Sequence, residues 1–487
     1  MSDAPPQDEI RPPADPQHRH NPPPADPAPP RPRLILDLST SLIWEGKPSV
    51  GMVRVERELA RALLARTDIE SGFVHLERNR RIFREIGRER AKAIIDAVTP
   101  PVDAATARRD ALRGRARKVE RRALRLAPEE LRWPLHEFGI AGARLVIALR
   151  DWMTGRERRA RAATRPAPLE TQVAADRALF RREDLLLLTG LGCDVWDDEL
   201  CRLKQATGTT IVHIVHDVIP YLMPEYCTPQ MPQFFLRYMR NALQASDAML
   251  AVSRSTRRDL QRFCLETGAP ERPIDVIRHG CDIASPGGEV GPELAALRGS
   301  RFLLYVSTLE PRKNHALLVS LWRDLYAARR EETPVLVLVG ERGWRSQDLL
   351  GMLESSALYP RFIRIFHGLH DRELAWLYRN CLFTLYPSLY EGWGLPISES
   401  LAHGKVCIAA NVASMPEAAE GFGLLLAPLD GPGWYEAICR LLDDDAYRAS
   451  LELPIRTNYR AMSWKESAGR VLDGVIARWH RGVAESS

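Results

Sequence analysis

Residues 382–399, Leu-Phe-Thr-Leu-Tyr-Pro-Ser-Leu-Tyr-Glu-Gly-Trp-Gly-Leu-Pro-Ile-Ser-Glu, form the stretch that decides the fold class. The apolar run at its start predicts a buried strand, and Pro387 with Ser388 predicts a turn. Pro396 suits the first turn of a helix, and Gly404 suits the position just past its end. A strand that leads through a glycine-bearing loop into a helix is the repeating unit of α/β proteins with a parallel sheet.

The same alternation continues on both sides of this stretch. Short apolar runs that predict buried strands are separated by helical segments and fall into two sets: 34–38, 185–188, 210–215, 248–253 and 274–277, then 302–306, 335–339, 363–366, 382–386 and 406–410. A long helical region, 434–484, is expected to close the chain. Two successive arrays of this kind predict two Rossmann-like domains that face each other across a cleft.

Composition shifts divide the chain into segments. Residues 1–31 contain mainly Pro, Asp and Arg, which predicts a disordered tail. We expect an N-terminal Rossmann-like domain at 32–285 that carries an Arg-rich, mainly helical insertion at 77–182. A C-terminal Rossmann-like domain is expected at 286–462, and a final helix at 463–487 that crosses back to the N-terminal domain.

The overall composition excludes several classes of protein. The 487 residues are 45% hydrophobic and 27% charged, which is typical of a globular chain and not of a disordered, collagenous or membrane-embedded one. The apolar runs are far shorter than the roughly 20 residues that span a bilayer, and the N-terminus has no apolar segment of a secretory signal. The eight cysteines form no CxxC pair, which predicts free thiols in the cytoplasm and no zinc site.

Two carboxylates bracket the glycine loop of the first stretch. Gly392 and Gly394 allow backbone amides to approach a ligand closely, and the helix N-terminus beside them favours anionic oxygens. Glu391 precedes the loop and Glu399 is expected in the first turn of the helix, so both can accept hydrogen bonds from one ligand. The alternative is a plain strand–loop–helix junction in which Glu399 only complements the helix dipole.

Two further segments place polar groups at strand ends. In Tyr305-Val-Ser-Thr-Leu-Glu-Pro-Arg-Lys-Asn314, Arg312 and Lys313 are expected in the first turn of a helix, where two cations predict a diphosphate site. The alternative is a solvated helix start. His216 and Asp217 end another strand, at the sheet edge where open α/β folds bind ligands. A purely structural histidine is the alternative there.

Together these segments resemble a known enzyme family. Glu391…Glu399 resembles the E-x7-E motif of retaining GT-B glycosyltransferases of family 4 (glycosyl transferases group 1), in a bacterial mannosyltransferase-like subgroup. The resemblance covers the chain from Leu34 to about Trp479. It implies that Glu391 binds hydroxyls of the donor sugar and Glu399 the nucleotide ribose. The amides around Gly392, Trp393, Gly394 and Leu395 would face the sugar and diphosphate.

The resemblance also assigns the other segments. Lys313 matches the lysine of the family's donor-phosphate loop, Thr308 stands where the family often has an arginine, and Arg312 is the candidate substitute. His216 is implied at the donor sugar and the reaction centre, while Asp217 orients the loop or touches the acceptor. Gly368 and Leu369 are implied at the nucleotide base, and Gly51 in the flexible loop between donor and acceptor. Arg54 could reach the phosphate or the acceptor, or it could be a surface residue. Ser414–Glu417 matches a family loop near the cleft, without assigned roles.

The implied reaction moves a hexose from a nucleotide sugar, with GDP-mannose the first candidate donor, to a lipid-linked or surface-polysaccharide acceptor. The resemblance implies front-side attack with retention, no protein nucleophile, and no metal or other cofactor. Two alternatives remain at this point. One is another GT-B enzyme, a nucleotide-sugar epimerase or a glycogen-type phosphorylase. The other is a non-catalytic GT-B scaffold of a polysaccharide assembly complex.

Charge is distributed unevenly along the chain. The net charge is only +5, but residues 77–182 hold 27 Lys and Arg against 14 Asp and Glu, whereas the rest holds 41 against 49. This basic region predicts either a solvated helix set or a face that docks on an anionic membrane surface, where each basic residue contributes about 1 kcal/mol. We therefore expect a cytoplasmic protein, which the second alternative attaches peripherally to the inner face of the membrane, and no nucleic-acid partner.

Overall fold

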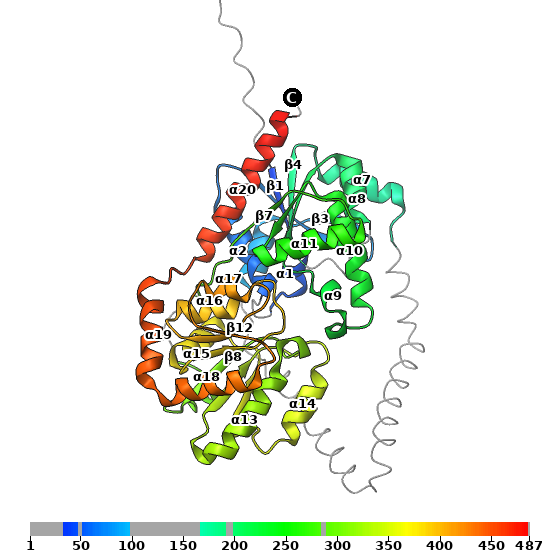
Figure 1. Cartoon of the computed structure of the whole chain (residues 1–487). Coiled ribbons are helices and arrows are strands. Elements are labelled where there is room, and N and C mark those ends of the chain that lie inside the picture. The colour runs from blue at the N-terminus through cyan, green and yellow to red at the C-terminus, as the bar shows by residue number, and fades with distance from the viewer. Residues whose placement is uncertain (1–32, 47–50, 98–165, 191–197, 284–288, 486–487) are drawn as a thin grey trace, which may run out of the picture. The chain divides into compact units, whose positions relative to one another are not determined.

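The computed structural model describes residues 33–46, 51–97, 166–190, 198–283 and 289–485 (Figure 1). The expected tail at 1–31, most of the Arg-rich insertion (98–165) and residues 284–288 at the expected domain boundary lie outside the described residues. Within them the chain forms two separate β-sheets, each with helices around it. The predicted class of two parallel-sheet α/β domains is thereby confirmed.

The N-terminal sheet has seven strands in the order β3-β2-β1-β4-β5-β6-β7. All neighbours pair in parallel except β2 and β3, which are antiparallel. Leu34 pairs with Leu185, and Leu186 with Ile211, so the central strands are apolar on both faces. The strands are β1 Arg33–Asp37, β2 Glu70–Glu77, β3 Ile82–Glu85, β4 Asp184–Leu188, β5 Thr210–Val215, β6 Ala248–Ala251 and β7 Ile274–Val276.

Helices cover both faces of this sheet. Alternate side chains of a strand point to opposite faces, so Leu34 and Leu36 pack in one core cluster and Ile35 in another. The helices of this domain are α1 Ser39–Ile43, α2 Gly51–Ala65, α3 Arg88–Asp96, α7 Leu169–Leu179, α8 Glu199–Thr207, α9 Ile219–Leu222, α10 Met231–Ala245 and α11 Arg254–Thr267.

The region predicted as mainly helical at 77–182 begins differently. Residues 82–85 form β3, an edge strand, and only then does the chain enter α3. The charged pattern of Arg-Ile-Phe-Arg-Glu concealed this strand, because its buried Ile82 and Phe83 are adjacent and its last two residues are exposed. The helical prediction is wrong for this part of the segment.

The C-terminal sheet has six parallel strands in the order β10-β9-β8-β11-β12-β13. Strand order therefore reverses between β8 and β11, which makes that pair the topological switch point of the sheet. The strands are β8 Phe302–Val306, β9 Val335–Val339, β10 Ile363–Phe366, β11 Thr384–Tyr386, β12 Cys407–Ala410 and β13 Leu424–Leu426.

Helices of the C-terminal domain connect these strands. The 3-10 turn η2 Pro311–Lys313 precedes the first long helix. The α-helices are α12 Pro292–Ala295, α13 His315–Arg329, α14 Ser346–Ser355, α15 Asp371–Asn380, α16 Leu395–Ala402, α17 Met415–Ala419, α18 Gly431–Asp443 and α19 Asp445–Asn458. Buried Trp322 and Trp434 are the largest side chains of its main core.

The predicted closing region at 434–484 consists of three helices, α18, α19 and α20 (Trp464–Glu485). Leu472 and Trp479 of α20 pack in the core cluster of the N-terminal domain, against α2. The two segments that join the domains run side by side, since the Cys281 amide donates to the Met462 carbonyl at 3.0 Å. Among the described residues, no helix combines the length and apolarity needed to cross a membrane.

Candidate active site

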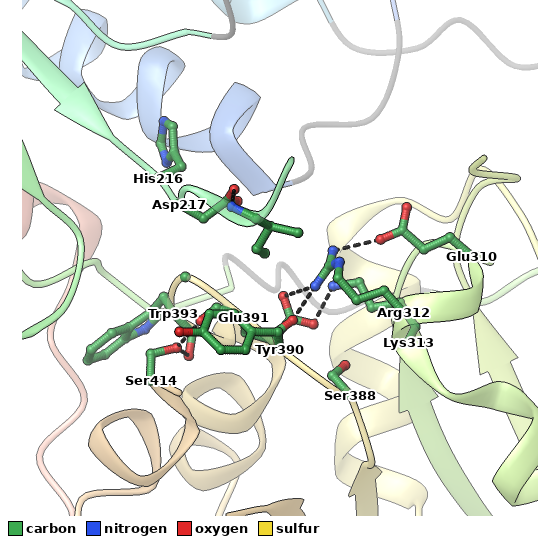
Figure 2. Close-up of polar contacts among 12 residues, drawn as sticks. His216, Asp217, Glu310, Arg312, Lys313, Ser388, Tyr390, Glu391, Trp393 and Ser414 are labelled. Atoms are coloured by element: carbon green, nitrogen blue, oxygen red, sulfur yellow. Dashed lines mark hydrogen bonds and ion pairs between the residues drawn. The ribbon is translucent and has the colours of Figure 1, made fainter. Parts of the chain in front are cut away.

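The switch point brings two loops of the C-terminal domain together. One follows β8 at residues 307–314, and the other follows β11 at residues 387–394. The Leu389 amide donates to the Arg312 carbonyl at 2.9 Å, which ties the loops to each other. The loop after β5 of the N-terminal domain, with His216 and Asp217, comes to the same place (Figure 2).

A three-residue ion cluster occupies the junction of the two C-terminal loops. Lys313 Nζ lies 2.5 Å from Glu391 Oε1, and Arg312 Nη1 lies 3.1 Å from Glu391 Oε2 (Figure 2). Arg312 also pairs with Glu310 at 2.6 Å and donates to the Tyr390 carbonyl. All three groups of the cluster are largely buried, so each cation is held by a carboxylate and not by water.

The local sequence explains the position of the cations. Pro311 opens η2, and Asn314 adopts φ +56°, a left-handed conformation that asparagine tolerates better than most residues. Asn314 also donates to the carbonyls of Pro387 and Pro428. Arg312 and Lys313 therefore precede α13 and do not lie in its first turn, which corrects that prediction.

Mutual attraction outweighs burial at Glu391 but not at Lys313. Burial alone would raise the pKa of Glu391, but the charges of Arg312 and Lys313 lower that pKa to about 2. Burial lowers the pKa of Lys313, and the negative charge of Glu391 opposes this. The two cations are balanced here by two carboxylates, Glu391 and Glu310, so an anionic ligand binds them by displacing a carboxylate.

The glycine loop approaches the N-terminal domain very closely. A Cβ added at Gly392 would lie 1.8 Å from the His216 carbonyl oxygen, so only glycine fits there. Gly394 has φ +102° and forms the N-cap of α16. The side chains of Trp393 and Leu395 pack against the N-terminal core cluster, so neither points into the ion cluster.

Hydroxyl groups fix the orientation of this loop. Ser414 Oγ lies 2.8 Å from the Glu391 carbonyl oxygen and 2.9 Å from that of Trp393. Thr256 Oγ1 lies 3.2 Å from the Gly392 carbonyl oxygen. The N–H of a trans peptide points opposite to its C=O. The amides of Gly392, Trp393 and Gly394 consequently point away from these hydroxyls.

Glu399 lies one turn inside α16 and not in its first turn, which argues against the alternative that it only complements the helix dipole. Its Oε2 accepts from the Tyr378 hydroxyl at 2.8 Å, and its Oε1 lies 3.8 Å from Arg54 Nη1. Burial raises the pKa of Glu399, while Arg54 and Tyr378 partly offset that effect.

Arg54 is not the surface residue that was one alternative for it. Its side chain is 7% exposed and pairs with Asp371, the first residue of α15, as well as approaching Glu399. Since Arg54 belongs to α2 of the N-terminal domain, it carries a positive charge across to two carboxylates of the C-terminal domain.

His216 lies just after β5, and its Nε2 is 2.7 Å from the Thr189 carbonyl oxygen. A carbonyl only accepts, so Nε2 carries the proton of the ring. Burial lowers the pKa of His216, which favours the neutral form. Asp217 accepts from the Ile219 amide at 3.0 Å and so orders its own loop.

The other predicted positions lie around this centre. Thr308 is exposed beside Gly343, and Gly51 is the first residue of α2. Gly368, at φ +64°, donates its amide to Glu341, and Leu369 packs against a C-terminal core cluster. Within the described part of the chain, none of these four positions makes a hydrogen bond or ion pair with the Glu391 cluster.

Sequence reasoning missed several residues that hold the site. Tyr378, Asp371, Thr189 and Thr256 contact Glu399, Arg54, His216 and Gly392 from distant segments. No local signal marks them. Ser414–Glu417 was the exception, because that motif was recognised, although without roles.

The described residues contain no group of three or more His, Cys, Asp or Glu that could hold a metal ion. Seven of the cysteines belong to this part of the chain, and all seven are free thiols.

Comparison with solved structures shows the fold class of this chain. Over 94% of this chain and 100% of the other, the fold matches sucrose-phosphate synthase of Thermosynechococcus elongatus with a TM-score of 0.56 at 17% identity. It also matches the N-terminal domain of Candida albicans trehalose-6-phosphate phosphatase with a TM-score of 0.55 at 13% identity, over 92% and 97% of the two chains. The fold is that of the GT-B class.

Sequence comparison then gives the family. Residues 300–444 match the family model "Glycosyl transferases group 1", and residues 176–285 match "Glycosyltransferase Family 4". The chain belongs to this glycosyltransferase family and is an enzyme of that type.

Two curated relatives come from Escherichia coli. O-antigen chain mannosyltransferase B is 28% identical over 56% of this chain and 70% of its own length. Serotype-specific mannosyltransferase WbdA is 24% identical over 61% of this chain but only 37% of its own length, so this chain spans little more than a third of that protein.

Proposed function

We propose that this glycosyltransferase transfers a hexose from a nucleotide sugar with retention of configuration, and that GDP-mannose is its donor. The observation that carries the proposal is the buried Glu391–Arg312–Lys313 cluster at the switch point of the C-terminal sheet. The names of the two Escherichia coli relatives, both mannosyltransferases, support the choice of mannose.

The cluster suits the donor's diphosphate and sugar. Arg312 and Lys313 supply the positive charge that a diphosphate leaving group needs as its bond to the sugar breaks. When the diphosphate binds these cations, Glu391 is released to accept hydrogen bonds from sugar hydroxyls. The amides of Gly392 and Gly394, which point away from Ser414, lie at the same end of the sheet and are available to the donor.

Arg54 and Glu399 suit the ribose. A buried carboxylate that is already oriented by Tyr378 can accept from two vicinal hydroxyls. Arg54 favours its ionised form from the N-terminal domain. The ribose site is therefore completed only when the two domains are in contact.

His216 contributes a neutral ring on the acceptor side. Because its Nε2–H is used by Thr189, the lone pair of Nδ1 is the group that can meet a hydroxyl of the sugar or acceptor. The reaction then depends mainly on positioning and on charge neutralisation, with no protein nucleophile. We further propose that two protein cations replace a metal ion, so full activity is expected after dialysis against EDTA.

The acceptor is proposed to be a lipid-linked or surface polysaccharide, and the similarity to O-antigen chain mannosyltransferase B supports this choice. The basic excess at 77–182 would then attach the protein peripherally to anionic lipid at the inner face of the cell membrane. The seven free cysteines of the described residues support a reducing, cytoplasmic location. Flotation with liposomes of anionic lipid at low salt tests the attachment. A protein that does not float with these liposomes would contradict the proposed membrane attachment.

A donor panel tests the proposal. Nucleotide release is measured with GDP-, UDP-, ADP- and dTDP-sugars, each with and without membrane lipid extract, and NMR gives the anomeric configuration of the product. We expect release from GDP-mannose, with retention and dependence on the extract. Nucleotide release from another donor instead would overturn the choice of GDP-mannose, and release from none of the donors would overturn the whole proposal.

A further inference from the structure

The first turn of helix α11 in the N-terminal domain contacts the Gly392–Gly394 loop, which is called the donor loop below. Ser253 is its N-cap, and the Ser253 hydroxyl accepts from the Thr256 amide. Two more amides of this turn, those of Arg254 and Ser255, donate to the two carboxylate oxygens of Glu417, each at 2.8 Å. Glu417 belongs to α17 of the C-terminal domain, so one domain supplies a capping carboxylate to a helix of the other.

A carboxylate at this position is physically favoured. The N-terminus of a helix carries unsatisfied N–H groups and a partial positive charge, and α11 is 14 residues long. A carboxylate that accepts from two such amides fixes both the position and the direction of the helix relative to α17. This contact is therefore a two-point attachment between the domains.

The side chain of Thr256 extends the attachment to the reaction centre. Thr256 Oγ1 lies 3.2 Å from the Gly392 carbonyl oxygen and 3.4 Å from the His216 carbonyl oxygen. One hydroxyl thus bridges the donor loop, which follows Glu391, and the loop that carries the candidate histidine. On the other side of the donor loop, Ser414 from the α17 N-cap holds the Glu391 and Trp393 carbonyls.

We propose that Thr256 and Glu417 form an interdomain clamp that sets the distance between His216 and the donor loop. They are positioning residues for the transfer step, and this role rests on the proposed glycosyltransferase function. Glu417 anchors the helix, and Thr256 transmits its position to both loops. Neither side chain is required to touch the donor, and Arg54 holds the ribose site through its own contacts with Asp371 and Glu399. The clamp therefore acts on turnover and not on nucleotide affinity.

The test combines two readouts on the full-length protein. The variants are Glu417→Ala, Thr256→Val and Thr256→Ser, and the control is Asp444→Ala, which removes the side-chain cap of α19 at a site remote from the donor loop. Hydrogen–deuterium exchange follows the peptides that cover the first turn of α11 and the donor loop. Turnover of GDP-mannose and binding of GDP by calorimetry are measured in parallel.

We expect faster exchange in both peptides for Glu417→Ala and Thr256→Val, with kcat lowered by about tenfold to a hundredfold and the Kd for GDP within about twofold of wild type. Thr256→Ser retains the hydroxyl and should restore kcat, and Asp444→Ala should leave kcat unchanged. Unchanged exchange, or faster exchange with unchanged kcat, would overturn the clamp. If the wild type turns over no nucleotide sugar, the proposed function fails, and unchanged exchange alone would still overturn the clamp.

Discussion

Lys313 Nζ lies 2.5 Å from Glu391 Oε1, although 78 residues separate them in the chain. The cation suited to the donor's phosphate is thus held by the carboxylate suited to the donor's sugar. Without donor, the site neutralises most of its own charge, which lowers the cost of burying three ionised side chains. Binding of a nucleotide sugar exchanges this internal pair for contacts with phosphate and sugar.

The first prediction concerns Lys313. Lys313→Met removes the charge and keeps an apolar stem of similar length, so Glu391 retains only Arg312. One charge-assisted bond to the diphosphate is lost, and the Kd for GDP should rise by about tenfold to a hundredfold. Calorimetry measures this. Lys405→Met, which removes a lysine bonded to the Cys381 carbonyl in the same domain, is the matched control and should leave GDP binding unchanged. Equal affinities for wild type and Lys313→Met would exclude Lys313 from the phosphate site.

The second prediction separates the two partners of Arg54. Arg54→Gln leaves the buried Glu399 without its nearby cation, so its pKa should rise further above the usual range for glutamate. Protonated Glu399 accepts hydrogen bonds from two ribose hydroxyls less well than the carboxylate does. The loss of GDP affinity at low pH, the acid limb of the binding curve, should therefore begin at a higher pH. Asp371→Asn removes a charge that itself raises the pKa of Glu399, so it should not move that limb to higher pH. Kd measured against pH decides this, and an identical acid limb in wild type and Arg54→Gln would contradict it.

The third prediction uses the close approach at Gly392. Gly392→Ala would place a Cβ 1.8 Å from the His216 carbonyl oxygen and force the two loops apart. A misplacement of about 1 Å costs on the order of a hundredfold in rate, so kcat should fall at least that far. The control is Gly351→Ala in the middle of α14, where an added Cβ would have no atom within 4 Å. This change should leave turnover unchanged and the stability equal or slightly higher. Turnover close to wild type in Gly392→Ala would show that the loops do not meet during the reaction.

The fourth prediction concerns stability and pH. Asp37 is fully buried at the end of β1, and burial together with the charge of Glu56 raises its pKa to about 8 from a usual 3.8. Between these two values the folded protein keeps a proton that the unfolded chain releases, so this group lowers the free energy of unfolding as pH rises. Asp37→Asn removes the effect and keeps an oxygen that can accept from Ser39. Relative to wild type, the variant should therefore gain stability from about pH 5 to about pH 8 in urea unfolding. A pH-independent difference would show that Asp37 ionises normally.

Much of the fold was predictable because buried parallel strands are continuous apolar runs. Leu185–Leu188 and Val335–Val339 are recognisable in this way, and the structure has strands at both places. Less apolar strands are not, since β2 has only three buried residues among eight, β3 has two exposed residues and β13 is only partly buried. None of these three strands was predicted. Their pairing is decided by neighbours in space and not by their own composition.

The candidate site was predictable to the extent that its residues are close in sequence to strand ends. Glu391, Lys313 and His216 each follow a strand, and the sheet order brings the first two into contact. The pairing of Arg54 with Asp371 joins residues 317 positions apart and left no local signal. The contact of Glu417 with α11 is of the same kind, because backbone amides as partners leave no trace in the sequence.

The central claim is that the Glu391 cluster holds a nucleotide sugar for transfer to a lipid-linked acceptor. The most direct measurement is the passage of radiolabelled mannose from GDP-mannose into membrane lipid extract, with wild type and Glu391→Gln assayed side by side. We predict labelled lipid with wild type and about 1% of that amount or less with the folded variant. Equal labelling by both proteins, or none by the wild type, would contradict the account.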